Sequence, residues 1–139
     1  MILELISFGF KTNSIPDTNH LIDVRLLNNP FYVAELKELT GLDKEVMNFF
    51  KEDPRVDEFL IKLYEWTTSI LNTNKSANKE KITIAIGCTG GQHRSPYITE
   101  CLAVYLTEKN VQFPEIVINH RELKKYNILK AKRAGECVS

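Results

Sequence analysis

The stretch that decides the fold runs from Lys81 to Ala103 and reads KITIAIGCTGGQHRSPYITECLA. Lys81 to Ile86 alternates and then runs apolar with β-branched residues, a pattern that predicts a buried strand. Ser95 to Leu106 carries apolar residues at helical spacing and predicts a helix. The segment between them is rich in glycine, so it predicts a tight turn that leads from the strand into the helix.

The turn is built from residues that suit an anion. The first N–H groups of a helix have no partner within the helix and point into one small volume. Glycines let the backbone approach a ligand closely, and Arg94 adds a planar fork of donors. We therefore predict a phosphate- or sulfate-binding loop. The alternative is a structural turn in which Ser95 caps the helix and Pro96 takes its first position. That alternative does not explain why the same turn also contains Cys, Thr, Gln, His and Arg.

Composition bounds the class of protein. A chain of 139 residues is expected to form one domain, and 18 basic residues balance 18 acidic ones, so no global field favours nucleic acid or membrane. No apolar run is long enough to span a bilayer and no signal peptide is recognisable, which predicts a cytoplasmic protein without membrane association. The three cysteines form no C-x-x-C pair, so we expect free thiols, no metal site and no cofactor.

Hydrophobic periodicity predicts an α/β fold. Strands are expected at Met1–Phe10, His20–Leu27, Lys81–Ile86 and Gln112–Asn119, and helices at Asp43–Lys51, Arg55–Asn72, Ser95–Leu106 and, as a basic helix, 120–133. The order strand, helix, strand over residues 81–119 is that of a βαβ unit, so the two strands are expected to be parallel. The expected architecture is a Rossmann-like, mostly parallel sheet of about four strands with flanking helices in two or three layers. Residues 1–126 form the domain, and 127–139 form a basic, partly frayed tail.

Several polar residues fall at the expected carboxyl ends of strands, where open α/β sheets bind their ligands. This convergence predicts one composite pocket. Its expected members are Asp23, Arg25, Cys88, Thr89, Gly90, Gly91, Gln92, His93, Arg94, Ser95, His120 and Arg121.

Four blocks, in this order, carry a family resemblance: DVRLLNNP (23–30), LTGLD (39–43), AIGCTGGQHRS (85–95) and His120-Arg121. Together they resemble the carboxyl-terminal domain of the RapZ/YvcJ family over roughly Phe8 to Lys125. The resemblance implies binding of a small regulatory RNA and of glucosamine-6-phosphate, a role as adaptor for a ribonuclease, and self-association. It further implies that Thr89, Gly90, Gly91, His93 and Arg94 hold the phosphate and that Asp23 contacts the sugar.

The sequence departs from the family in two respects. Phe31 stands where the family has a ligand-facing histidine, and a phenyl ring cannot donate to a sugar. The chain also contains no G-x-x-x-x-G-K-[ST] motif, so the P-loop that family members usually carry on another domain is not represented here. The expected ligand is therefore an anionic small molecule of the sugar phosphate class.

A late basic stripe is the basis for expecting RNA. Its members are Arg121, Lys124, Lys125, Lys130, Lys132 and Arg133. Lys and Arg side chains on one face neutralise backbone phosphates. The alternative is an ordinary solvated helix face.

A second functional class fits the same loop. The sequence places Cys88 and Arg94 between a strand and a helix, with five residues separating them. This arrangement matches the signature of cysteine-dependent phosphatases. In that scheme the thiolate of Cys88 attacks phosphorus, Arg94 and loop amides hold the oxygens, and Asp53 is the candidate acid. The same geometry binds a stable phosphate ester, so we favour a ligand-sensing or RNA-binding module over a catalyst.

Overall fold

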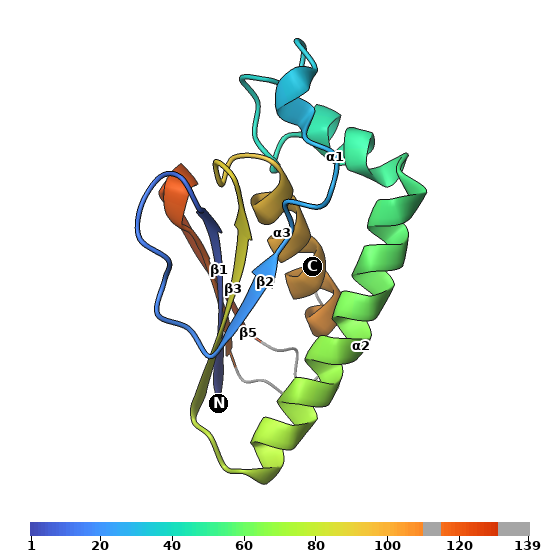
Figure 1. Cartoon of the computed structure of the whole chain (residues 1–139). Helices are drawn as coiled ribbons and strands as arrows, with labels where there is room; N and C mark the ends of the chain where they lie inside the picture. Colours follow the sequence, from blue (N-terminus) through green and yellow to red (C-terminus); the bar gives the residue numbers. More distant parts are fainter. Residues whose placement is uncertain (110–114, 131–139) are drawn as a thin grey trace.

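The computed structural model describes residues 1–109 and 115–130. A five-stranded sheet with the order β2-β3-β1-β4-β5 forms its centre (Figure 1). The strands are β1 (Ile2–Gly9), β2 (His20–Asp23), β3 (Lys81–Cys88), β4 (Glu115–His120) and β5 (Lys125–Lys130). The first four are parallel, and β5 pairs antiparallel with β4. The predicted mostly parallel α/β fold is confirmed, with one strand more than expected.

Three α-helices accompany the sheet. They are α1 (Lys44–Lys51), α2 (Pro54–Ser76) and α3 (Arg94–Glu108), with short 3-10 turns η1 (Pro30–Tyr32) and η2 (Arg121–Leu123). α3 packs on β1 and β3, and α2 packs on α3. Both helices lie on the same face of the sheet (Figure 1), so the arrangement is two-layered. The opposite face carries a small apolar cluster of Ile6, Phe8 and Ala85, with Phe10 against it.

Local sequence explains where α2 begins. Asp53 accepts a hydrogen bond from the Arg55 N–H and Pro54 takes the first helical position, which satisfies an unpaired donor and presets the backbone angle. The predicted apolar stripe of α2 is buried, and Trp66 packs at the border of the core, with its ring 5.2 Å from that of His20. Trp66 is therefore a packing residue, as its helical spacing indicates.

The expected basic helix over 120–133 is wrong. The chain turns through η2, takes a left-handed conformation at Lys124 (φ 55°) and returns as β5. Tyr126 and Ile128 are exposed, while Leu129 packs against the main core. Pairing with the free edge of β4 therefore decides the conformation of this charged segment. β5 runs to Lys130, past the expected domain boundary at 126, and residues 131–139 lie outside the described part of the chain.

The second strand is shorter than expected, because β2 ends at Asp23 rather than Leu27. The Asp23 carboxylate accepts from the Arg25 N–H, a local bond that favours a turn over continued strand. Arg25 therefore leaves the sheet, and the chain enters the loop that leads to η1.

Candidate functional site

The loop between β3 and α3 lies at the edge of the sheet where the parallel strands end. The register pairs Gly9 with Cys88, Asp23 with Gly87, and Ser7 with His120. The carboxyl ends of β1, β2, β3 and β4 therefore meet at one edge. This edge is where an open α/β sheet places its ligand.

The interior of the loop folds around the sulfur of Cys88. Sγ accepts the N–H groups of Gly91 at 3.2 Å and of Ser95 at 3.4 Å, and it lies 3.2 Å from Ser95 Oγ. The Ser95 hydroxyl donates its only proton to the Phe8 carbonyl, so the thiol is the donor to Ser95 Oγ. Cys88 therefore uses two of the loop amides and fixes the shape of the loop.

Two neighbouring glycines of the loop have different surroundings. Gly91 has φ of +70°, and a Cβ there would lie 2.7 Å from the Gly9 nitrogen and 2.9 Å from Glu122 Cγ. Gly91 is thus required by backbone conformation and close packing. A Cβ on Gly90 would meet no atom within 4 Å. Gly90 therefore presents bare backbone to open space.

Arg94 is the most unusual charged residue of the site. Its Nη1 donates to the carbonyls of Arg25 and Leu27, and its Nη2 donates to Thr89 Oγ1. Arg94 is only 5% exposed. Its Nε is buried without a partner. None of the ion pairs in the described residues involves Arg94. A buried guanidinium without a counter-ion is energetically costly, and it favours an anion beside it.

A cavity of about 230 Å³ opens beside this loop. The residues that line it are Lys11, Asn29, Phe31, Tyr32, Cys88, Thr89, Gly90, Gln92, His93 and Arg94. Two of them are cations and none carries a carboxylate. Within residues 1–109 and 115–130, the N–H groups of Gly90, Gln92 and His93 have no hydrogen-bond partner. The cavity thus combines positive charge with free backbone donors.

Gln92 and His93 hold the segment that follows η1. Gln92 Nε2 donates to the carbonyls of Lys37 and Leu39, and His93 Nε2 lies 2.9 Å from the Leu36 carbonyl. Since a carbonyl only accepts, His93 carries its proton on Nε2, and a neutral ring leaves Nδ1 as an acceptor. Burial lowers the pKa of His93, which favours this neutral form.

Asp23 and Arg25 form a pair with each other. Arg25 Nη2 lies 2.7 Å from Asp23 Oδ2, and the Arg25 guanidinium lies 3.9 Å from the centre of the Phe10 ring. The hydrogen bond from Arg25 lowers the pKa of Asp23, and Arg94 contributes in the same direction. Both side chains are about half exposed. Neither is among the residues that line the cavity, and Arg25 contributes its backbone carbonyl to Arg94.

His120 is placed away from the cavity. Its Nδ1 lies 2.7 Å from Ser7 Oγ and its Nε2 lies 2.8 Å from Glu100 Oε1. The order Ser, His, Glu resembles a hydrolytic triad, yet the Ser7 side chain is fully buried, so its hydroxyl cannot meet a substrate. This group is a buried link between β1, β4 and α3.

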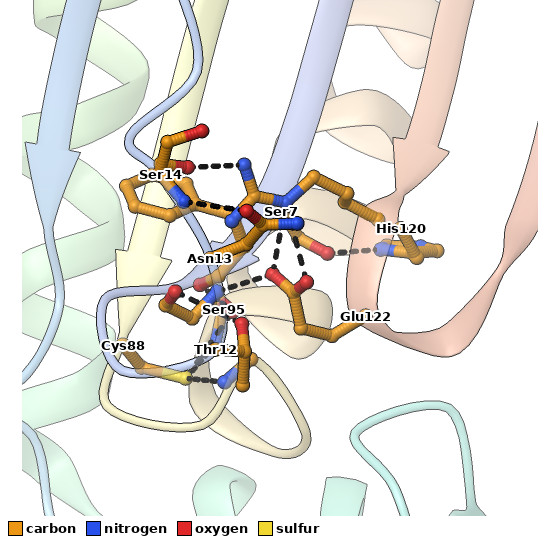
Figure 2. Close-up of polar contacts among 12 residues, drawn as sticks. Ser7, Thr12, Asn13, Ser14, Cys88, Ser95, His120 and Glu122 are labelled. Carbon is orange, nitrogen blue, oxygen red and sulfur yellow. Dashed lines mark hydrogen bonds and ion pairs between the residues drawn. The ribbon is translucent and has the colours of Figure 1, made fainter.

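Arg121 and Glu122 fasten η2 to β1 and to the segment that follows it. Figure 2 shows the Glu122 carboxylate among these polar contacts. Glu122 Oε2 accepts the Gly9 N–H at 2.6 Å and lies 3.1 Å from Arg121 Nε. Arg121 Nη1 donates to the Ser14 carbonyl, and its guanidinium lies 5.4 Å from the centre of the Phe8 ring. Arg121 therefore ties η2 to the β1–β2 connection and does not line the cavity.

Four cavity residues were absent from the expected members of the pocket: Lys11, Asn29, Phe31 and Tyr32. Of these, the family resemblance had already placed Phe31 at a ligand-facing position. Lys11 follows the end of β1, so the strand-end argument applied to the other strands could have found it. Asn29 and the two aromatic residues belong to the loop around η1, where no hydrophobic period indicates an orientation.

The residues of the phosphatase alternative are not brought together. Cys88 and Arg94 both line the cavity. Asp53 instead caps α2, where it accepts from Arg55 N–H and from Asn28 Nδ2. Of the expected RNA-binding residues, Lys124 and Lys125 are exposed, Arg121 is engaged as described, and Lys132 and Arg133 lie outside the described residues.

Two kinds of feature are missing from the described residues. No helix there combines the length and apolar character needed to cross a bilayer. No group of three His, Cys, Asp or Glu side chains there is arranged to hold a metal ion.

Comparison with known proteins agrees with the family resemblance described above. A nucleotide-binding protein of Lactobacillus delbrueckii subsp. bulgaricus is 44% identical over 124 residues, covering 89% of this chain and 41% of that protein. Nucleotide-binding proteins of Shewanella halifaxensis and Thermotoga neapolitana are 41% and 39% identical and are covered to 43%. The chain thus spans about two fifths of the length of these relatives. The family model of the RapZ C-terminal domain matches residues 1–124. The chain belongs to the RapZ C-terminal domain family.

Proposed function

We propose that this domain binds a phosphorylated small metabolite of the sugar phosphate class in the cavity beside the β3–α3 loop and senses its concentration. The observation that carries the proposal is Arg94, a buried guanidinium without an ion-pair partner that lines a cavity free of carboxylates. An anion in the cavity supplies the missing counter-charge. Charge-assisted hydrogen bonds of this kind are about twice as strong as neutral ones.

The remaining polar groups of the cavity have complementary tasks. The free N–H groups of Gly90, Gln92 and His93 donate to phosphate oxygens, as at other helix N-termini. Lys11 adds a second positive charge at the cavity wall. A neutral His93 accepts from a ligand hydroxyl or ammonium through Nδ1.

The same residues connect the ligand to the surface loops. Arg94 holds the carbonyls of Arg25 and Leu27, and Gln92 and His93 hold those of Lys37, Leu39 and Leu36. A ligand that orders the β3–α3 loop also stabilises the segment from 25 to 41. A sensor needs this kind of differential contact, since a ligand shifts a conformational equilibrium only through unequal affinity for the two states.

Calorimetry with the full chain tests the proposal. Inorganic phosphate, glucose 6-phosphate and glucosamine 6-phosphate are titrated into the wild type and into Arg94→Gln, which removes the charge and keeps most of the length. We expect at least a tenfold loss of affinity in Arg94→Gln. The matched control is Arg55→Gln, an exposed arginine of α2 with a 65% exposed side chain, which should bind as the wild type does. Absence of heat from every phosphorylated compound contradicts the proposal.

RNA contact is a second proposed role, supported by the exposed Lys124 and Lys125 beside a separate cavity that also touches His120. A protein partner such as a ribonuclease, and self-association, belong to the same adaptor role and rest on family membership. If these lysines meet RNA phosphates, log K should fall linearly with log salt concentration, and Lys124→Ala should reduce the slope by about 1. A response independent of salt excludes this contact.

The phosphatase alternative is supported by one feature, the presence of Cys88 among the residues that line the cavity. Against it, the thiol donates its proton to Ser95 and no lining residue supplies a carboxylic acid to protonate a leaving group. We expect no hydrolysis of an aryl phosphate. Hydrolysis that Cys88→Ser abolishes would establish the enzyme instead.

A further inference from the structure

The wall of the cavity that faces solvent is aromatic. Phe31 and Tyr32 both line it, with 44% and 84% of their surfaces exposed. Their ring centres lie 5.8 Å apart, with the ring planes at 85° to each other. Neither side chain is part of the core or among the partly buried residues that pack against it.

The backbone beneath these rings is anchored. Asn29 caps η1 by accepting the Phe31 N–H, and Pro30, in the first helical position, is buried. The Lys37 ammonium lies over the Phe31 ring, 4.8 Å from its centre, a cation–π contact that favours one ring orientation. Local structure therefore holds the Phe31 ring at the cavity, and the largely exposed Tyr32 ring contacts it edge-on.

Such a wall differs in chemistry from the rest of the cavity, and the two together suit a ligand with two unlike ends. The β3–α3 loop offers cations and backbone donors, which suit a phosphate. Phe31 and Tyr32 offer π-faces and ring edges, which suit another planar ring in stacked or edge-to-face contact. The hydroxyl groups of a plain sugar have no hydrogen-bond partner in the Phe31 side chain.

We infer that the ligand is a phosphomonoester that carries a planar aromatic or heteroaromatic ring, with its phosphate at the β3–α3 loop and its ring against Phe31 and Tyr32. The inference rests on one part of the proposed function, the binding of a phosphorylated metabolite in this cavity, and it replaces the plain sugar part of that ligand with a ring-bearing group. Phe31 is then a specificity-determining residue, and it should affect ring-bearing ligands alone. Arg94 should affect every phosphorylated ligand.

The test compares three probes with the full chain by calorimetry: inorganic phosphate, glucose 6-phosphate and phenyl phosphate, with adenosine 5′-monophosphate as a larger ring-bearing probe. Stacking of one ring on an aromatic side chain gives roughly a tenfold gain in affinity. We expect phenyl phosphate and adenosine 5′-monophosphate to bind at least tenfold more tightly than glucose 6-phosphate. Phe31→Ala should remove that preference and leave the affinity for inorganic phosphate unchanged.

Tyr126→Ala provides the matched control, since Tyr126 is an exposed aromatic residue of β5 outside the cavity. It should retain the preference for ring-bearing ligands. Equal affinity of the wild type for glucose 6-phosphate and phenyl phosphate overturns the inference while leaving the proposed function intact, and so does an unchanged preference in Phe31→Ala. Failure of all probes, inorganic phosphate included, overturns both.

Discussion

Gly90 and Gly91 are neighbours in one loop, and the structure predicts opposite consequences when each becomes alanine. At Gly91 the backbone is left-handed, and a Cβ would approach the Gly9 nitrogen at 2.7 Å. The left-handed conformation alone costs about 1–2 kcal/mol for a residue with a side chain. With the backbone clash added, we expect Gly91→Ala to lose roughly 2–4 kcal/mol, or roughly 6–12 °C in Tm for a domain of this size.

Gly90→Ala should behave in the opposite way. Its Cβ meets no atom within 4 Å, and its φ is not positive. Replacing a glycine at such a position stabilises a protein by about 0.4–1 kcal/mol, because the unfolded chain loses freedom. The new methyl group, however, stands at the wall of the phosphate cavity. Displacing the phosphate from one loop N–H removes a hydrogen bond to a charged group, which is about 1.5–3 kcal/mol or roughly tenfold to hundredfold in affinity.

Thermal unfolding followed by circular dichroism, and calorimetry with inorganic phosphate, measure the two effects separately. Gly90→Ala should keep the Tm of the wild type or exceed it, and bind phosphate at least tenfold more weakly. Gly91→Ala should melt earlier. A Gly90→Ala variant that is fully stable and binds phosphate as tightly as the wild type would refute the placement of the ligand over this loop.

Substitutions at three further residues test the contacts around the site. Burial lowers the pKa of His93 in the folded protein. The stability that this residue supports is therefore fully present above the unfolded pKa near 6.5 and is lost as the pH falls toward the folded pKa. Urea unfolding should give a lower free energy of unfolding at pH 5 than at pH 7, and the difference should be smaller in His93→Gln. The lowered pKa of Asp23 acts in the same direction but below pH 4, so a loss confined to that range would point to Asp23 instead. Glu122→Ala leaves the Gly9 N–H without its acceptor and should cost about 1–3 kcal/mol, whereas Glu122→Gln keeps an acceptor oxygen and should cost less; equal losses in urea unfolding would contradict this role. Asp53→Ala removes the cap of α2 and should cost about 1 kcal/mol with no effect on phosphate binding; a loss of phosphate binding at unchanged stability would contradict a purely capping role of Asp53.

The central strand, loop and helix could be predicted because three independent signals coincide there. A β-branched apolar run, a glycine-rich turn and a helical period follow one another from Lys81 to Leu106. Segment 125–130 could not be predicted in the same way. Its lysines and apolar residues suit an exposed helix or an edge strand, and only the free edge of β4 decides between them.

The composite pocket shows a second limit of sequence reasoning. Strand ends predict which edge of the sheet a residue occupies, and that prediction holds for Cys88, Asp23 and His120. The position of a residue at a strand end does not predict on which face of the sheet its side chain lies. His120 shares the alternation of Ile116 and Ile118 and lies beneath α3 against Glu100, whereas Phe31 and Tyr32 reach the cavity from an irregular loop.

The proposed function depends on free amides of the β3–α3 loop that bind a phosphate beside Arg94. The most direct measurement is a two-dimensional ¹H–¹⁵N NMR titration of the full chain with inorganic phosphate. We expect saturable shifts of the Gly90, Gln92 and His93 amide signals, absent in Arg94→Gln, while the amide signals of β5 do not shift. Unmoved loop signals at saturating phosphate, or equal shifts in Arg94→Gln, would contradict it.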